Sequence, residues 1–243
     1  MISYDISGSG PTIVFASGAF NDKDTCRPLA QALESQFTCV LYDRRGRGGS
    51  HDIAPPYTVE QEVEDLDWLI GQVGGPVHVF GFSSGAVLAL HAVASGLPIQ
   101  KLALYEPPSV VDAVGSDHVG PITRLVEAGH RGEAVEYFQT EIIGMPVEIV
   151  HQIRNAPFRA SMEAIAPSLV HDVLLVSHVS SDLVSSVKSP ALVIVGAESP
   201  SLLHDAGASI AAGLPHGSLV TLEGQTHDLV PSAIVPVMAP FLT

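Results

Sequence analysis

A serine between two glycines is the first residue whose setting points to chemistry. Ser83 lies in a Gly-x-Ser-x-Gly motif at residues 81–85, between the apolar run at residues 77–80 and a helix-like stretch. Small residues at Gly81 and Gly85 permit a sharp strand-to-helix turn, which holds the serine hydroxyl at the edge of a sheet. The next amide, on Ser84, lies at a helix N-terminus, where it can bind an oxyanion. The motif therefore predicts that Ser83 is a nucleophile.

A serine of ordinary reactivity needs a base beside it in space. His227 follows the apolar run Ser218 to Leu222, in a loop downstream of Ser83. The chain order of nucleophile first and histidine last occurs in known catalytic triads. We therefore predict His227 as the general base.

Six short apolar runs predict the strands that must position these side chains. Runs without polar alternation are typical of strands covered on both faces. Helix-length segments separate them, and one such segment begins at the capping box Thr58 to Gln61 and ends at Gly74. This alternation predicts an α/β fold with a mostly parallel sheet and helices on both faces. The runs are Thr12 to Ala16, Thr38 to Tyr42, Val77 to Phe80, Lys101 to Tyr105, Ala191 to Val195 and Ser218 to Leu222.

The alternation breaks between Pro107 and Ser189. This stretch contains helical segments and no convincing strand, and it is too long for an ordinary crossover connection. It predicts a core domain formed by residues 1–106 and 189–243, with a helical cap, or lid, inserted at residues 107–188. The alternative is a plain helical extension with no role in binding.

Composition excludes several classes of protein. The 243 residues are 46% hydrophobic and 15% charged, with a formal net charge of −15, which disfavours binding to nucleic acid and to anionic membranes. No window approaches 18 uninterrupted apolar residues and no signal peptide is visible, so we expect a cytoplasmic protein. Cys26 and Cys39 cannot form a disulfide framework. The histidines and cysteines lack metal-ligand spacing, and we predict no metal and no cofactor.

Over essentially its whole length the chain resembles the α/β-hydrolase superfamily. The resemblance rests on five segments: Gly8-Ser9-Gly10-Pro11, Ser17-Gly18-Ala19-Phe20, the turn Asp43 to Ser50, the serine motif, and Gly224-Gln225-Thr226-His227. It implies an α/β-hydrolase fold and a second oxyanion donor, the amide of Ala19, beside that of Ser84. Ser17 stands where a histidine often precedes the glycine, so a common side-chain support is missing. The Arg-rich turn Arg44 to Arg47 is expected to be structural, with a phosphate site as the weaker alternative.

The resemblance leaves the third triad member open. The usual aspartate position after the run Ala191 to Val195 holds Ser199, and Glu198 lies one residue away. Glu106 follows the preceding predicted strand, where enzymes similar to the fungal zearalenone lactonases place the acid. We favour Glu106, with Glu198 as the alternative acid. Asp228 is close in sequence to His227 and is expected to cap the C-terminal helix instead.

Together these residues predict a cofactor-free serine hydrolase that cleaves a carboxylic ester or lactone through an acyl-enzyme. The alternatives are a lyase or carbon–carbon bond hydrolase on the same triad, or a ligand-binding receptor with weak turnover. The expected partner is a small, neutral, moderately hydrophobic substrate. Candidate apolar contacts in the predicted cap are Met145, Val147, Ile149, Phe158 and Met162, and candidate polar contacts are His118, His130, His151, His171 and His178.

Overall fold

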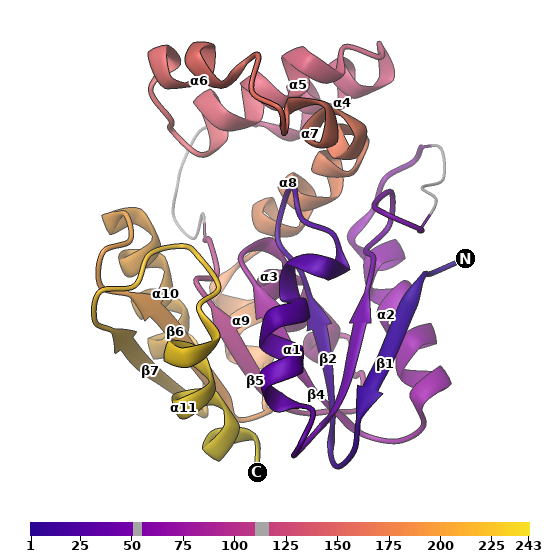
Figure 1. Ribbon diagram of the computed structural model, residues 1–243, viewed down its shortest axis with the longest axis vertical. Coiled ribbons are helices and arrows are strands. Elements are labelled where there is room, and N and C mark those ends of the chain that lie inside the picture. The colour runs from indigo at the N-terminus through magenta and orange to yellow at the C-terminus, as the bar shows by residue number, and fades with distance from the viewer. Residues whose placement is uncertain (51–54, 110–116) are drawn as a thin grey trace.

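A seven-stranded sheet forms the centre of the computed structural model, which describes residues 1–50, 55–109 and 117–243 (Figure 1). Its strand order is β1-β3-β2-β4-β5-β6-β7, and only β1 runs antiparallel to its neighbour. The mostly parallel sheet and all six predicted strands are confirmed. The strands are β1 (Tyr4–Gly8), β2 (Thr12–Ala16), β3 (Thr38–Tyr42), β4 (Val77–Phe82), β5 (Ile99–Tyr105), β6 (Ala191–Gly196) and β7 (Gly217–Leu222).

The sequence patterns missed β1. Its five residues are partly exposed, and it pairs with β3 alone at the edge of the sheet. An edge strand needs no continuous apolar run, because solvent reaches it. The predicted strands, by contrast, include β4, whose six residues are all buried.

Helices cover both faces of the sheet. Helices α1 (Arg27–Leu33) and α11 (Pro231–Leu242) contact one another and share one apolar cluster with the sheet. The opposite face carries α2 (Val59–Val73), α3 (Ser84–Ala94), α9 (Ser181–Ser186) and α10 (Ser201–Gly213), which join a second cluster. A short 3₁₀ helix, Lys23–Cys26, precedes α1. The sheet is therefore covered on both faces, as its apolar strands require.

Helix α2 begins and ends where the sequence predicts. The Thr58 side chain accepts a hydrogen bond from the Gln61 amide, and the Gln61 side chain accepts one from the Thr58 amide. Gly74 follows the last turn with a positive φ of 76°. The capping box and the glycine stop are confirmed.

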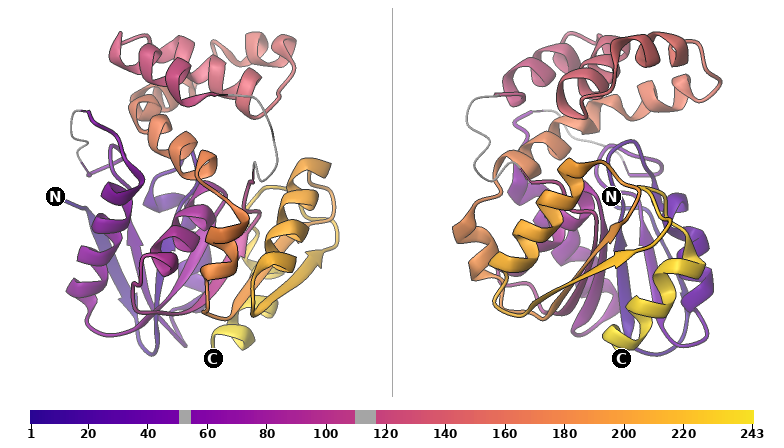
Figure 2. Two further views of the ribbon diagram at one scale, coloured as in Figure 1. Left: turned by 180° about the vertical axis from the view of Figure 1, so that it is seen from behind. Right: turned by 90° about the vertical axis from the view of Figure 1, so that its left-hand side faces the viewer.

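The chain between β5 and β6 forms a helical insert above the carboxyl ends of the strands (Figures 1 and 2). Its first helices surround a third apolar cluster, separate from the other two. Its last helix, α9, packs instead against α3 and α10 of the core. A cap over residues 107–188 remains a prediction, and these contacts attach the final helix to the core. The earlier helices are α4 (Val119–Glu127), α5 (Arg131–Tyr137), the π-helical turn Phe138–Ile142, α6 (Val147–Ile153), α7 (Arg159–Ile165), the 3₁₀ turn Ala166–Ser168 and α8 (Leu169–Ser177).

One helical run within the described residues, Arg159–Ser177, is long and apolar enough to cross a membrane. It also carries Arg159 and Asp172, which are both buried and both paired with opposite charges. Buried apolar residues of the same run, such as Leu169 and Leu175, pack in the clusters of the insert and the core. These contacts are those of a helix packed inside a soluble protein.

Candidate active site

Ser83 occupies a strained turn between β4 and α3. Its φ of 54° and ψ of −123° lie outside the regions that side chains prefer, and α3 starts at the next residue. A Cβ on Gly85 would lie 2.1 Å from the carbonyl oxygen of Ala16, so only glycine allows the helix to approach β2 this closely. The predicted strand-turn-helix setting of Ser83 is confirmed.

Backbone strain is concentrated at this site. In the described parts of the chain, only three residues other than glycine have a positive φ: Phe20 at 59°, Ser83 at 54° and Glu106 at 49°. They follow β2, β4 and β5, which are neighbours in the sheet. Such conformations cost on the order of 1–3 kcal/mol each and are commonest at functional sites. The three strained turns therefore lie after neighbouring strands, at the same edge of the sheet.

Glu106 and His227 are in direct contact. Glu106 Oε2 is hydrogen-bonded to Nδ1 of His227, although 121 residues separate the two in sequence. Glu106 is completely buried, whereas the His227 side chain is 41% exposed. An ionised carboxylate only accepts hydrogen bonds, so Nδ1 carries the proton and Nε2 of the imidazole is left as the basic nitrogen.

The second oxygen of Glu106 has two further partners. Oε1 accepts hydrogen bonds from the Gly196 amide, at 2.7 Å, and from the Ser199 hydroxyl. Burial by itself would raise the pKa of Glu106, but the hydrogen bonds from His227, Ser199 and Gly196 outweigh it and hold the pKa below its ordinary value. Glu106 is therefore ionised at neutral pH and held by three donors.

Tyr105 ties the loop of His227 to the sheet. Its hydroxyl donates to the carbonyls of Thr226, at 2.7 Å, and Asp228, at 3.1 Å, which flank the histidine. The rings of Phe82 and His227 lie 4.8 Å apart. Phe82 directly precedes Ser83, so this contact brings the imidazole to the serine turn.

The turn after β2 passes beside Ser83. A Cβ on Gly18 would lie 2.8 Å from the Cβ of Ser83. Within the part of the chain that the structure describes, the amides of Ala19 and Ser84 donate to no carbonyl or side chain. The predicted role of these two amides as oxyanion donors remains a prediction.

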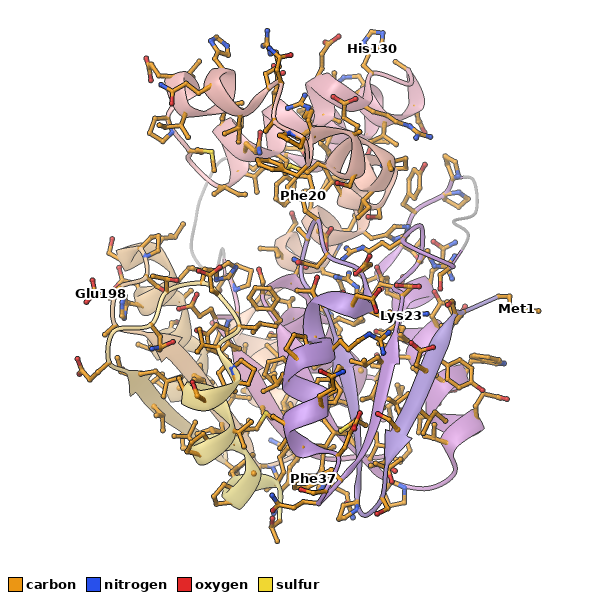
Figure 3. All side chains as sticks on the ribbon, in the orientation of Figure 1. Met1, Phe20, Lys23, Phe37, His130 and Glu198 are labelled. Carbon is orange, nitrogen blue, oxygen red and sulfur yellow. The ribbon has the colours of Figure 1, made fainter. Side chains whose placement is uncertain are left out.

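The two other acids lie elsewhere. Glu198 is exposed at the periphery of the molecule (Figure 3), and its amide donates to the Gln225 carbonyl at 2.9 Å. The Asp228 carboxylate accepts a hydrogen bond from the Thr226 hydroxyl at 3.0 Å. The prediction that Asp228 caps the C-terminal helix is wrong. Helix α11 starts at Pro231 after Val230, without a side-chain cap, because Asp228 is too far upstream and is engaged locally.

The candidate contacts in the insert differ in exposure. Val147, Ile149 and Phe158 are exposed, and Met162 packs against the cluster inside the insert. Met145 is half-buried. Their role toward a substrate remains a prediction.

The candidate histidines of the insert also fall into different settings. His171 is buried against the ring of Tyr57, and Nδ1 of His118 is hydrogen-bonded to the Tyr137 hydroxyl at 2.9 Å. His130, His151 and His178 are exposed. The contacts of His118, His130 and His178 are with residues of the insert itself, namely Tyr137, Glu133 and Leu174. The role of all five histidines toward a substrate remains a prediction.

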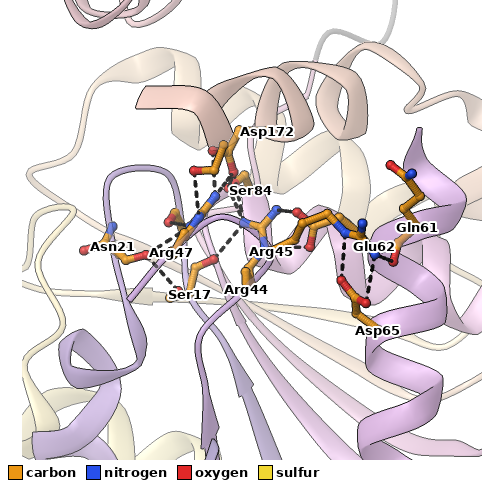
Figure 4. Close-up of polar contacts among 12 residues, drawn as sticks. Ser17, Asn21, Arg44, Arg45, Arg47, Gln61, Glu62, Asp65, Ser84 and Asp172 are labelled. Carbon is orange, nitrogen blue, oxygen red and sulfur yellow. Dashed lines mark hydrogen bonds and ion pairs between the residues drawn. The ribbon is translucent and has the colours of Figure 1, made fainter. Parts of the chain in front are cut away.

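The arginines of the turn Arg44 to Arg47 form ion pairs within the protein. Arg44 and Arg47 are buried and paired with Glu62 and Asp172, and Arg45 pairs with Asp65 (Figure 4). Their donors are therefore directed into the protein, which fits the structural role expected from the resemblance. Residues 1–50, 55–109 and 117–243 contain no group of three His, Cys, Asp or Glu side chains that could hold a metal ion.

The family is established by comparison with known proteins. Residues 13–235 match the model described as the alpha/beta hydrolase family. The chain belongs to the alpha/beta hydrolase family. A crystal structure of an alpha/beta hydrolase from Sphaerobacter thermophilus DSM 20745 is 43% identical, with a TM-score of 0.90 over 100% of this chain and 96% of that one. The whole described hydrolase fold is thus shared with a solved structure.

Other relatives of this alpha/beta hydrolase are more distant. The enol-lactonase from Burkholderia xenovorans LB400 is 22% identical over 91% of this chain and 87% of that one, with a TM-score of 0.68. A pimeloyl-[acyl-carrier protein] methyl ester esterase from Stenotrophomonas maltophilia (strain K279a) is 31% identical over 103 residues, or 41% of this chain and 37% of the esterase. The curated relatives are matched over 32% to 37% of their length. The family assignment therefore rests on the family model and on the Sphaerobacter structure, and the enol-lactonase shows a shared fold.

Neither Tyr105 nor the support by Ser199 is predicted from the sequence. One feature of the sequence could have pointed to Ser199: it occupies the position where the resemblance places the triad aspartate. Its hydroxyl here reaches the acid that comes from the neighbouring strand. Tyr105 gives no signal, since an aromatic residue at the end of an apolar strand is ordinary in a core.

Proposed function

We propose that the protein is a serine hydrolase that cleaves a carboxylic ester or lactone without a cofactor. The observation that carries the proposal is the hydrogen bond between buried Glu106 and Nδ1 of His227, at the sheet edge where Ser83 stands in its strained turn. It supports the assignment of Ser83, His227 and Glu106 as nucleophile, base and acid. The proposal therefore takes Glu106, and not Glu198, as the acid.

The reaction would run in two halves. Ser83 Oγ attacks the carbonyl carbon while Nε2 of His227 takes the hydroxyl proton, and the amides of Ala19 and Ser84 bind the oxyanion. The intermediate collapses to an acyl-enzyme as His227 protonates the leaving oxygen. Water then attacks the acyl carbon, His227 takes its proton, and the acid leaves as Ser83 regains its hydrogen. Ionised Glu106 stabilises the imidazolium in both halves.

The expected substrate is small, neutral and moderately hydrophobic. The net charge of −15 disfavours an anionic substrate, and Val147, Ile149 and Phe158 expose apolar surface on the insert. The similarity to a methyl ester esterase and to an enol-lactonase supports an ester or lactone bond. A cap formed by the insert would select among such substrates.

A fluorophosphonate probe tests the nucleophile without a known substrate. We expect intact-protein mass to show one adduct on the wild type and none on Ser83→Ala. Ser95→Ala is the matched control, because Ser95 is an exposed serine at the far end of α3, and it should keep the adduct. An adduct that persists on folded Ser83→Ala would refute the assignment.

Hydrolysis in ¹⁸O-labelled water then separates the reaction classes. An ester or lactone cleaved through an acyl-enzyme gives an acid that carries one solvent oxygen. A lyase on the same residues gives a product without solvent oxygen. A receptor gives a ligand-dependent rise in melting temperature and no product.

A further inference from the structure

Four charged side chains are buried together where the insert meets the core (Figure 4). Arg44 and Arg47 come from the loop after β3, Glu62 from α2 and Asp172 from α8. None exposes more than 1% of its side chain. Removal of charges from water is costly, and apolar residues of similar volume often replace buried ion pairs without loss of stability. Stability by itself therefore does not account for this cluster.

Arg47 uses every donor of its guanidinium group. Nη2 donates to both carboxylate oxygens of Asp172 at 2.7 Å, and Nε donates to the Ser168 hydroxyl at 3.1 Å. Nη1 donates to the carbonyls of Gly18 and, at 3.1 Å, Asn21. The guanidinium is a rigid planar fork. Because Asp172 holds one arm, it sets the position from which the other arm reaches Gly18.

The Gly18 carbonyl and the Ala19 amide belong to one peptide group. In a trans peptide the C=O and N–H bonds point in opposite directions, so a contact that holds the carbonyl also aims the N–H. A cation on the carbonyl polarises the peptide and strengthens its N–H as a donor. Arg47 therefore orients and polarises the Ala19 amide, a proposed oxyanion donor, through the Gly18 carbonyl and without a contact to the substrate.

Asp172 also contacts Ser84, the residue whose amide is the second proposed donor. The Ser84 hydroxyl donates to Asp172 Oδ1 at 2.6 Å. Arg44 Nη1 donates to the same oxygen at 2.9 Å and to the Ser17 carbonyl at 2.9 Å. Ser17 precedes Gly18 in the turn beside Ser83, so one carboxylate joins both sides of the proposed oxyanion hole.

We propose that Asp172, acting through Arg47, is a positioning residue of the oxyanion hole, so that the insert must be seated on the core for the hole to be formed. This inference rests on the proposed serine-hydrolase function. Arg47 and Asp172 are 125 residues apart and come from the core and the insert. The two arginines hold the carbonyls of Ser17 and Gly18 in this turn.

The rate of fluorophosphonate labelling measures the oxyanion hole directly. In this step Ser83 Oγ bonds to phosphorus, fluoride leaves, and His227 takes the serine proton, while charge develops on the phosphoryl oxygen. The variants are Asp172→Asn and Arg47→Lys, with Ser84→Ala as a milder third that keeps the amide. The matched control is Asp65→Asn, which breaks the Arg45–Asp65 pair of the same loop and α2.

Loss of one oxyanion donor costs about 10²- to 10³-fold in other enzymes, so misdirection of one should slow labelling by about 10- to 100-fold. We expect this fall in the second-order rate constant for Asp172→Asn and Arg47→Lys, and less than about a twofold change for Asp65→Asn. A merely structural role would lower the labelled fraction and the melting temperature, and would leave the rate constant of the folded fraction unchanged.

The outcomes separate the two proposals. A wild type that takes no label contradicts the proposed function and this inference with it. A wild type that labels, with folded Asp172→Asn and Ser84→Ala labelling at the wild-type rate, contradicts only the role of Asp172. If Asp172→Asn does not fold, Arg47→Lys and Ser84→Ala decide the result by their rate constants.

Discussion

The Glu106 carboxylate accepts hydrogen bonds from three donors. Its positive φ turns the carboxylate from the end of β5 toward the loops after β6 and β7. Ser199 and Gly196 then occupy one oxygen and His227 the other. A carboxylate with both oxygens occupied cannot rotate away, so the imidazole it holds keeps one tautomer and one orientation.

At this scale we expect Glu106→Gln to lower kcat by about 10³- to 10⁴-fold, because a neutral amide neither fixes the tautomer nor stabilises the imidazolium. Glu198→Gln is the matched control and should retain wild-type kcat, since Glu198 is exposed. Both are measured by steady-state hydrolysis of a chromogenic ester. Loss of turnover in Glu198→Gln alone would show that the acid is misassigned.

The elements meet closely at the turn of Ser83. Helix α3 follows a buried strand and packs on α2, α8 and α9. These contacts fix the direction of its first turn. Close approach of this turn to β2 places the Ser84 amide beside the turn that carries Ala19. The turn of Ser83 and the turn that carries Ala19 therefore depend on the same spacing between β2 and β4.

Two glycine substitutions test this dependence. Gly85→Ala places a methyl group against the Ala16 carbonyl and should destabilise the fold by more than about 3 kcal/mol. Gly71→Ala in α2 meets nothing within 4 Å and should stabilise the helix by about 0.5–1 kcal/mol. Urea denaturation of the two variants should give changes of opposite sign. Equal changes would contradict the close contact at Gly85.

Over the whole molecule, the buried charges link the insert to the core and make stability depend on pH. Burial by itself would raise the pKa of Glu62, but the adjacent Arg44 guanidinium outweighs burial and lowers it. The pKa of buried Asp172 is lowered in the same way by Arg47 and Arg44. Both carboxylates bind protons more weakly in the folded than in the unfolded chain. Their stabilisation is therefore present above the ordinary carboxyl pKa and is lost as pH falls below it.

We expect the free energy of unfolding to fall as pH decreases below about 4.5, the ordinary value for glutamate. Glu62→Gln breaks a buried pair and should cost about 3 kcal/mol at pH 7. This difference from the wild type should shrink at pH 4 and below, because Glu62 of the unfolded wild type then binds a proton that the folded protein binds more weakly. Glu64→Gln, on the exposed face of α2, is the control and should change little at either pH. Urea unfolding at a series of pH values measures all three proteins, and a constant difference for Glu62→Gln would contradict the expectation.

The sequence by itself determined six of the seven strands, the boundaries of α2, the serine turn and the order of serine before histidine. These features are written in local patterns: unbroken apolar runs, a capping box, and glycines at a tight turn. The edge strand β1 was missed because Tyr4 to Gly8 contain no unbroken apolar run. The helical segments between β5 and β6 were predicted as a unit, and their contacts place α9 with the core.

Tertiary structure alone decided which carboxylate meets His227 and what the arginines of the turn contact. Glu106 and His227 are 121 residues apart, and Arg47 and Asp172 are 125 apart. Glu106 and Glu198 both follow sheet strands, and the sequence favours Glu106 only through the resemblance to a known family. The difference arises because the positive φ of Glu106 directs its carboxylate toward the histidine loop, whereas Glu198 faces solvent. Contacts of this kind depend on the register of strands and on where a helix packs, and no local sequence pattern predicts either.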